Sequence, residues 1–147
     1  ASLIVDLLVQ VAADFAPPPA GRDPLQALRT ELFLVAKAAD ALPGRLLGSL
    51  LGDVQNDPEI RAALRTGLFS PRRSATARVI REAQKLGQLS GDVPALVAVD
   101  LLYGPLFYRS FIRHEPLTRR FVAQVIEHVL GGLAPRSRAA TPPRRSG

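Results

Sequence analysis

Apolar residues recur along most of the chain with the spacing of one face of an α-helix. In residues 2–15 they fall at Leu3, Leu7, Leu8 and Val11, and residues 24–40 and 43–54 repeat the pattern. Side chains three, four or seven positions apart share one side of a helix, so this periodicity predicts amphipathic helices. Three consecutive prolines at 17–19 should end the first helix, because proline cannot donate a backbone hydrogen bond.

Capping residues predict where the later helices begin and end. Asp57 stands before Pro58 and an acidic first turn, which is typical of a helix start. We expect helices over residues 57–86, 93–113 and 117–131. Ser70-Pro71 either kinks the first of these or caps a new helix, and Gly104-Pro105 predicts a kink in the second. Gly87 is placed to end a helix in the left-handed conformation.

These segments predict an all-α domain, a bundle of about six helices over residues 1–133, with no β-hairpin pattern. Residues 134–147 contain only Ala, Pro, Arg, Ser, Thr and Gly. Such a segment has nothing to bury, so we expect a disordered tail.

The net charge of +6 does not by itself predict nucleic-acid binding, because much of it lies at the C-terminus. Four of the 19 basic residues, and none of the 13 acidic ones, lie in the last fourteen positions. The rest of the chain carries 15 basic and 13 acidic residues, which gives no electrostatic reason to bind a phosphate backbone.

The composition also limits the cellular location and the cysteine chemistry that are expected. There is no Cys, so disulfides and thiolate ligands are excluded and a reducing, cytoplasmic location fits. No uninterrupted apolar run reaches the length of a bilayer span, so no membrane partner is expected. The sequence also contains no Met, and we therefore expect a processed chain or a fragment.

Candidate catalytic chemistry is scarce. His114 and His128 have no second ligand at helical spacing, so no metal is predicted. No nucleophile elbow, dinucleotide fingerprint or phosphate loop occurs, and we expect neither an enzyme nor a cofactor.

Residues 100–111 hold the more informative positions. Asp100 interrupts an apolar helix, either as a solvent-facing or Arg-paired residue or as a ligand contact. Tyr103, Phe107 and Phe111 share one helical face. Core packing explains such a stripe by default, and a pocket wall is the functional alternative.

A longer pattern runs through these segments. The chain resembles the C-terminal domain of tetracycline-repressor (TetR) family regulators over roughly residues 1–133, through the stretches Asp57–Arg65, Ser70–Arg73, Gly87–Leu89, Asp100–Arg109 and His114–Leu117. The resemblance implies that these helices bind a small effector and form a homodimer. It also implies that operator DNA is bound only through an N-terminal helix-turn-helix, which this sequence lacks.

The apolar surface of the last two helices independently favours a homodimer. It exceeds what one small bundle can bury, so we expect a two-fold four-helix interface. The predicted interface residues are Tyr108, Val122, Ile126, Val129 and Leu130.

The resemblance also implies an effector pocket inside the bundle, beside the predicted kink. The predicted ligand-binding residues are Phe33, Phe69, Arg73, Asp100, Tyr103 and Phe107. They suit a small apolar or aromatic effector that releases a repressor from DNA. The alternative is a helical homodimeric interaction module with no small-molecule ligand, in which the interior is fully packed.

Overall fold

The computed structural model describes residues 3, 5–6, 9–10, 22–41 and 44–136. Within these residues it is entirely helical, and the element order is α2 (Pro24–Ala41), α3 (Gly44–Asn56), α4 (Pro58–Leu64), η1 (Arg65–Phe69), α5 (Ser70–Lys85), α6 (Ala95–Phe107), η2 (Tyr108–Ile112) and α7 (Arg119–Gly132). The predicted all-α bundle is therefore confirmed. Most of the predicted helix 2–15, and the predicted tail from residue 137 on, lie outside the described residues.

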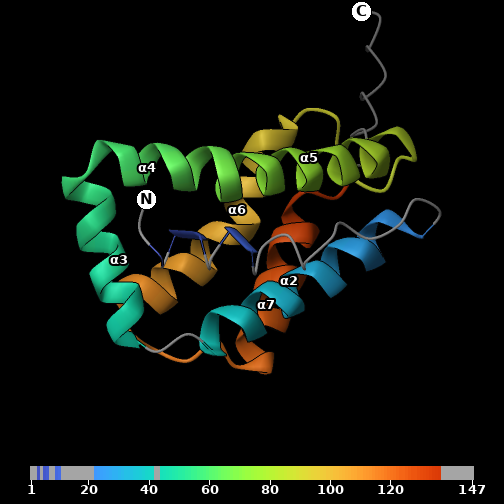
Figure 1. Ribbon diagram of the computed structural model, residues 1–147. Coiled ribbons are helices and arrows are strands. Elements are labelled where there is room, and N and C mark those ends of the chain that lie inside the picture. Colours follow the sequence, from blue (N-terminus) through green and yellow to red (C-terminus); the bar gives the residue numbers. More distant parts are fainter. Residues whose placement is uncertain (1–2, 4, 7–8, 11–21, 42–43, 137–147) are drawn as a thin grey trace, which may run out of the picture.

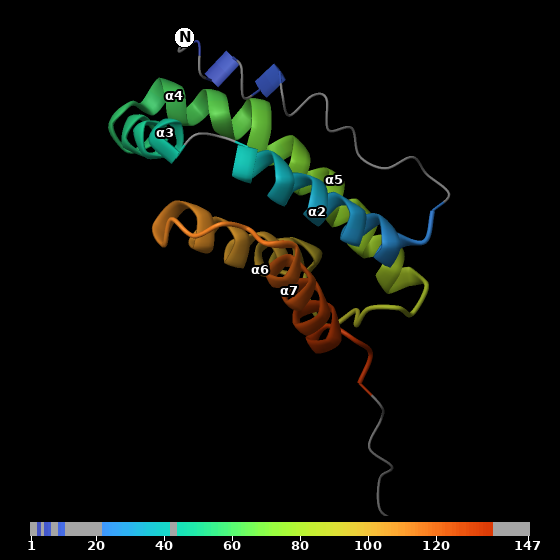
Figure 2. The same ribbon diagram turned by 90° about the horizontal axis from the view of Figure 1, so that it is seen from below.

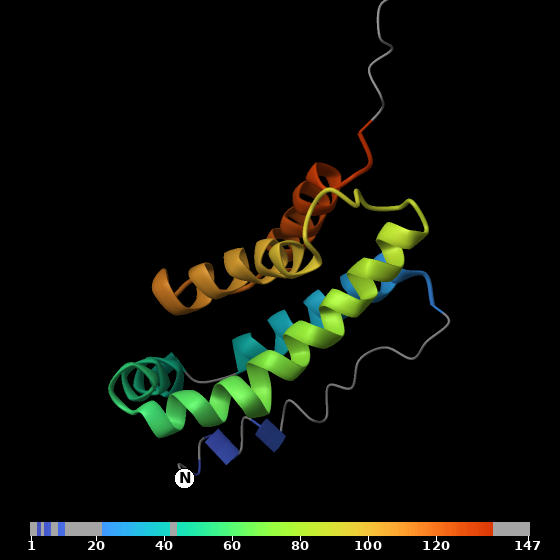
Figure 3. The ribbon, with the colours of Figure 1, turned by 90° about the horizontal axis from the view of Figure 1, so that it is seen from above.

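The helices form two layers. Figures 2 and 3 show α2 beside the long rod of α4 and α5, with α6 and α7 packed across them as the second layer. Helix α3 lies crosswise to α4, at the N-terminal end of α4 (Figure 1). The main core lies between the layers, and Leu28, Ile80, Leu102 and Val122 are each at most 1% exposed there. A smaller core of Val5, Leu50 and Leu64 joins the N-terminal segment to α3 and α4.

The helix ends predicted at Asp57 and Gly87 are present. The Asp57 carboxylate accepts hydrogen bonds from the backbone amides of Glu59 (2.8 Å) and Ile60 (3.3 Å), and it satisfies donors that have no partner inside the helix. Thr118 caps α7 in the same way, through the amide of Phe121. Gly87 has the predicted positive φ, 72°. Helix α7 runs through Gly131 and ends at Gly132, slightly later than expected.

Two π-helical turns lie beside the prolines at which the sequence predicted kinks. Residues 58–85 stay helical through Ser70-Pro71. Just before the proline, η1 forms a wider turn in which the Ser70 amide donates a hydrogen bond to the carbonyl of Arg65. Pro105 lies inside α6, which continues to Phe107, and η2 follows. A π-turn holds one residue more than an α-turn, so each shifts the phase of the side chains that follow it.

Candidate functional site

Three polar side chains from three helices meet in the interior. Glu31 of α2 is 8% exposed and Thr76 of α5 is 1% exposed. Tyr103 of α6 donates its hydroxyl hydrogen to Oε1 of Glu31 (2.8 Å), and the Thr76 hydroxyl lies 2.9 Å from the same oxygen. We call Glu31, Thr76 and Tyr103 the buried polar cluster. It ties α2, α5 and α6 together at one atom.

Arg72 balances the charge of the buried polar cluster. One of its guanidinium nitrogens lies 3.8 Å from Oε1 of Glu31. The pKa of Tyr103 is raised, first because burial penalises the phenolate and then because the charge of Glu31 opposes a second negative charge. Tyr103 therefore stays a neutral hydrogen-bond donor at physiological pH.

Aromatic rings adjoin this cluster. Tyr103 and Phe107 are stacked with ring centroids 6.1 Å apart, and Phe107 lies 5.5 Å from Phe111. Phe69 approaches Phe107 edge-on at 6.3 Å. We call these four rings the aromatic cluster. Phe69 is the last residue of η1 and Phe111 belongs to η2, so both π-turns border it.

The structure brings together half of the predicted ligand-binding residues. Tyr103, Phe107 and Phe69 are neighbours, as described above. Phe33 lies under the guanidinium of Arg119, 4.8 Å from the ring centroid, and thus packs toward α7. It does not join the aromatic cluster.

Arg73 and Asp100 pair with each other on the surface. Arg73 donates from Nε (2.9 Å) and from a terminal nitrogen (2.7 Å) to the two oxygens of Asp100. Their side chains are 41% and 59% exposed. The hydrogen bond to Arg73 lowers the pKa of Asp100. The Arg-paired alternative for Asp100 is therefore correct, and neither residue points to an interior ligand.

Sequence reasoning missed Glu31 and Thr76. Glu31 lies three residues after Leu28 and four before Val35, inside the apolar stripe of its own helix. An acid at such a position is the signal that could have revealed it, because a carboxylate on a core-facing stripe needs polar partners.

The outer side of α6 and η2 carries an exposed apolar stripe, formed by Val97, Leu101, Tyr108 and Ile112 at 46–63% exposure. Among the described residues, Ala95–Ile112 is the one helical stretch long and apolar enough to cross a membrane by those criteria alone. Asp100 and Arg109 interrupt its apolar residues, so the sequence pattern did not predict it. Core helices of soluble proteins meet the same criteria, so they do not by themselves show a membrane span.

Of the predicted interface residues, Tyr108 is exposed, whereas the four on α7 lie in or against the core of the single chain. Tyr108 is exposed, at 56%. Val122, Ile126 and Leu130 are 0–7% exposed and belong to the core of the single chain, and Val129 packs against that core. Their assignment to a dimer axis stays a prediction, but in this structure these side chains already have partners.

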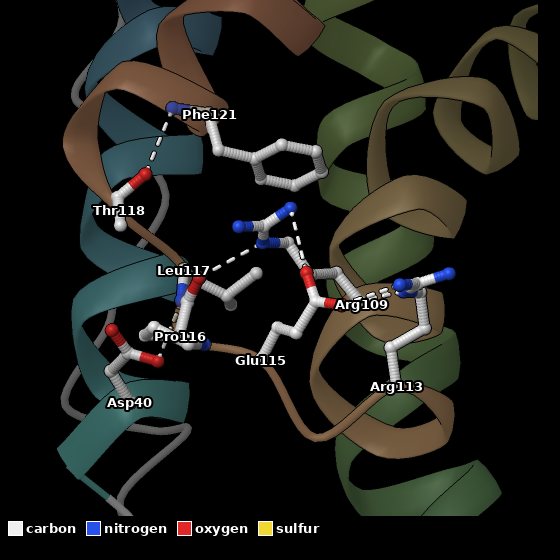
Figure 4. Close-up of polar contacts among 8 residues, drawn as sticks. All are labelled: Asp40, Arg109, Arg113, Glu115, Pro116, Leu117, Thr118 and Phe121. Carbon is white, nitrogen blue, oxygen red and sulfur yellow. Dashed lines mark hydrogen bonds and ion pairs between the residues drawn. The ribbon is translucent and has the colours of Figure 1, made fainter.

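Polar contacts fix the connection between η2 and α7 (Figure 4). Nε of Arg109 donates to the carbonyl of Pro116 (2.9 Å), and another of its nitrogens lies 3.2 Å from Glu115. Its guanidinium also lies 4.3 Å from the ring centroid of Phe121. Arg113 binds the same Glu115 at 2.7 Å. We call Arg109, Arg113 and Glu115 the turn cluster.

Helix α2 reaches the same connection. The Asp40 carboxylate accepts a hydrogen bond from the amide of Leu117 (2.9 Å), whose side chain is buried in the core (Figure 4). One helix thus carries Glu31 to the interior cluster and Asp40 to the start of α7. Within the described residues, no group of three potential metal ligands lies together.

The chain is similar to one protein family, to a sequence relative and to a solved structure. Residues 18–129 match the model of the tetracyclin repressor-like C-terminal domain. The chain is 26% identical over 133 residues to YdeS of Bacillus subtilis (strain 168), an uncharacterized HTH-type transcriptional regulator, covering 90% of this chain and 67% of YdeS. It matches the crystal structure of the TetR family transcription regulator SCO0332 with a TM-score of 0.76 and 30% identity, covering 89% of this chain and 72% of that one.

Both relatives are transcriptional regulators, which defines the class of protein. Within that class, the chain belongs to the TetR family, through its C-terminal domain.

Proposed function

We propose that the chain is the ligand-sensing and dimerisation domain of a TetR-family repressor, and that a small aromatic effector releases the repressor from operator DNA in the cytoplasm. The observation that carries the dimerisation half is the exposed apolar stripe on α6 and η2. The sensing half rests on family membership and on the aromatic cluster beside a buried carboxylate.

The stripe has the geometry of a helix–helix interface. Val97, Leu101, Tyr108 and Ile112 recur at intervals of four, seven and four residues, so they project to one side of the rod. Contiguous exposed apolar surface of this kind marks association sites in soluble proteins. A second copy of the chain would cover the stripe around a two-fold axis, since identical surfaces meet in such an interface.

Leu101→Asp tests the dimer. A charge placed in an apolar interface without a partner costs about 3 kcal/mol, so association should weaken by more than about a hundredfold. Sedimentation should show a dimer for the unmodified chain and a monomer for the variant. Leu86→Asp is the matched control, because Leu86 is 66% exposed but lies at the end of α5. A monomeric unmodified chain, or a Leu101→Asp dimer, would contradict the proposal.

Ile126→Asp would be a poorer test of the same interface. Ile126 is 4% exposed within a single chain. A carboxylate there would unfold the protomer whether or not the protomer dimerises.

Effector binding would act by shifting populations. An effector held among α2, α5 and α6 would favour one arrangement of these helices over another, and the dimer would transmit the difference. A thermal-shift screen of apolar aromatic compounds tests it: hits should stabilise the unmodified chain and should lose their effect in Phe107→Ala. No hits at all would favour the interaction module without a ligand.

A further inference from the structure

The exposed apolar stripe on α6 and η2 has a gap at its centre, and Gly104 occupies it. Leu101 and Tyr108 of the stripe are seven residues apart, and Gly104 lies three residues after the first and four before the second. Positions with this spacing share one side of a helix, so Gly104 lies in line with the stripe. It is exposed in the single chain. The stripe therefore presents uncovered backbone between two large side chains.

Packing within the single chain does not require glycine at position 104. A Cβ built there would meet no atom within 4 Å beyond its own helical turn and its chain neighbours. Among the described glycines, Gly87 is the one with a positive φ, so Gly104 has no left-handed backbone to explain it. Glycine inside a helix is destabilising relative to alanine. The reason for glycine here therefore lies in another contact or in the proline that follows.

Pro105 does not require glycine before it. A proline disfavours the helical conformation in the preceding residue, because its ring approaches that residue's Cβ and N–H. Ser70 precedes Pro71 in the same way, and it is helical with φ −65° and ψ −44°. This chain thus accommodates a residue with a Cβ before a proline within a helix. A contact outside the single chain remains as the explanation for Gly104.

A second copy of the chain fits the charges around the stripe. A two-fold axis brings a surface against itself, so any net charge on that surface would face its own sign. The stripe residues are uncharged. The two charged residues within Ala95–Ile112 are Asp100 and Arg109, and each pairs within its own chain, with Arg73 (2.7 Å) and with Glu115 (3.2 Å). Nothing in this stretch therefore repels an identical surface.

We propose that the α6 helices of two copies cross at Gly104, and that the missing side chain there sets how closely the two helices approach. The distance between packed helices depends on the side chains at their contact. With the two-fold axis at Gly104, Leu101 and Tyr108 lie on either side of the crossing and pack against the partner's α6. This inference rests on the proposed dimerisation and deepens it by placing the axis on the chain.

Enlarging residue 104 tests the crossing through the sign of the effect. Gly104→Leu adds apolar area to the stripe, which would strengthen a contact that had room for it. At the crossing the added side chain would force the helices apart. The dissociation constant should therefore rise about a hundredfold in Gly104→Leu and about tenfold in Gly104→Ala, as measured by sedimentation equilibrium. Dimers as tight as that of the unmodified chain, or tighter, would overturn the proposal.

Gly52→Leu is the matched control. Gly52 is an exposed glycine inside α3, where a Cβ would also meet nothing within 4 Å, and it lies off the stripe. The same enlargement there should leave the dissociation constant unchanged. Circular dichroism should show the helices intact in the Gly104 variants, because no atom of the single chain opposes the new Cβ. An equal weakening by Gly52→Leu would show that the effect does not belong to the crossing.

An introduced thiol tests the same point by distance, and it still applies if Gly104→Leu fails to fold. The chain has no cysteine, so a disulfide in a single-cysteine variant can only join two copies. A disulfide needs Cα atoms about 4.4–6.8 Å apart, which only residues close to the two-fold axis reach with their own counterparts. Gly104→Cys should oxidise to a covalent dimer on a non-reducing gel, since the bond traps even a weakened dimer. Val97→Cys, at the end of the stripe, should stay reduced.

A Gly104→Cys variant that stays reduced, or a Val97→Cys variant that cross-links as readily, would overturn the placement of the axis. The unmodified chain separates that failure from the failure of the proposed function. If the unmodified chain dimerises and the Gly104 variants behave like it, the crossing is wrong while the dimer stands. If the unmodified chain is a monomer, the dimerisation half of the proposed function falls, and the crossing falls with it.

Discussion

The buried polar cluster and the turn cluster each hold several side chains around one carboxylate, but they differ in how far water reaches that carboxylate. Each centres on a single acidic side chain: Glu31 binds Thr76 and Tyr103 of two other helices inside, and Glu115 binds Arg109 and Arg113 at the η2–α7 connection. Glu115 is 34% exposed, so water can replace a partner that is removed. The side chain of Glu31 is only 9% exposed, so water would replace a lost partner there less readily. The contact distances are similar, so the access of water decides what each contact contributes.

Glu31→Ala should have the largest effect. It removes an acceptor of Tyr103 and of Thr76, and it removes the carboxylate that lies 3.8 Å from the guanidinium of the partly buried Arg72. Breaking a buried ion pair from one side costs about 3 kcal/mol. Urea unfolding of the variant should show this loss. Glu31→Gln, which keeps shape and one acceptor, is the control and should lose less. Equal losses would mean that the charge of Glu31, and not its shape or the acceptor that Gln retains, accounts for the stabilisation.

Arg109→Ala should destabilise the protein less than Glu31→Ala does, but more than Arg113→Ala does. Arg109 binds the Pro116 carbonyl and covers the ring of Phe121 in addition to pairing with Glu115. Losing these contacts should cost about 1–2 kcal/mol. Arg113→Ala, which removes an exposed partner of the same Glu115, should leave the melting temperature unchanged. Equal destabilisation by both would show that the charge of Glu115, and not the contacts of Arg109, fixes the turn.

Tyr103→Phe should have a smaller effect at neutral pH than Glu31→Ala or Arg109→Ala, about 1 kcal/mol for one hydrogen bond. Its pH dependence is the sharper test. Because the pKa of Tyr103 is raised in the folded protein, its contribution is fully present below the unfolded value of about 10. That contribution is lost as the pH rises further, through the folded-state pKa.

Stability of the unmodified chain should therefore fall more steeply above about pH 10 than stability of Tyr103→Phe. Urea unfolding over a series of alkaline buffers measures the difference. Parallel curves would show that Tyr103 ionises as readily in the folded chain as in the unfolded one.

The fold was predictable because its signals are local. Asp57 before Pro58, Thr118 before α7 and Gly87 after α5 specify helix ends through interactions within a few residues. The sequence predicted a kink at Gly104-Pro105 and a kink or a new helix start at Ser70-Pro71, and a π-turn lies beside each of these prolines. Proline shows that one helical hydrogen bond is missing, but it does not show that a π-turn nearby will take up the difference.

The site was only partly predictable, since it depends on which helix faces which. Tyr103 and Phe107 were found because they share one face of one helix. Phe33 was placed with them, yet the packing of α2 turns it toward Arg119. Glu31 was missed because its partners are 45 and 72 residues away. The same dependence explains why α7, an apolar helix by pattern, uses Val122 and Ile126 within its own chain.

The two π-turns also bear on how such a domain changes by insertion and deletion. Each holds one residue beyond an ordinary helical turn, at 65–69 and at 108–112. Deleting one residue there would restore an α-turn and leave the following side chains close to their present directions, because the wider turn is what absorbs the extra residue. Deleting a residue from the regular α-helical turns of α5 would instead rotate the side chains beyond it by about 100° around the axis. The two π-turns are therefore the places in these helices where the chain can lose a residue without re-aiming the side chains that follow.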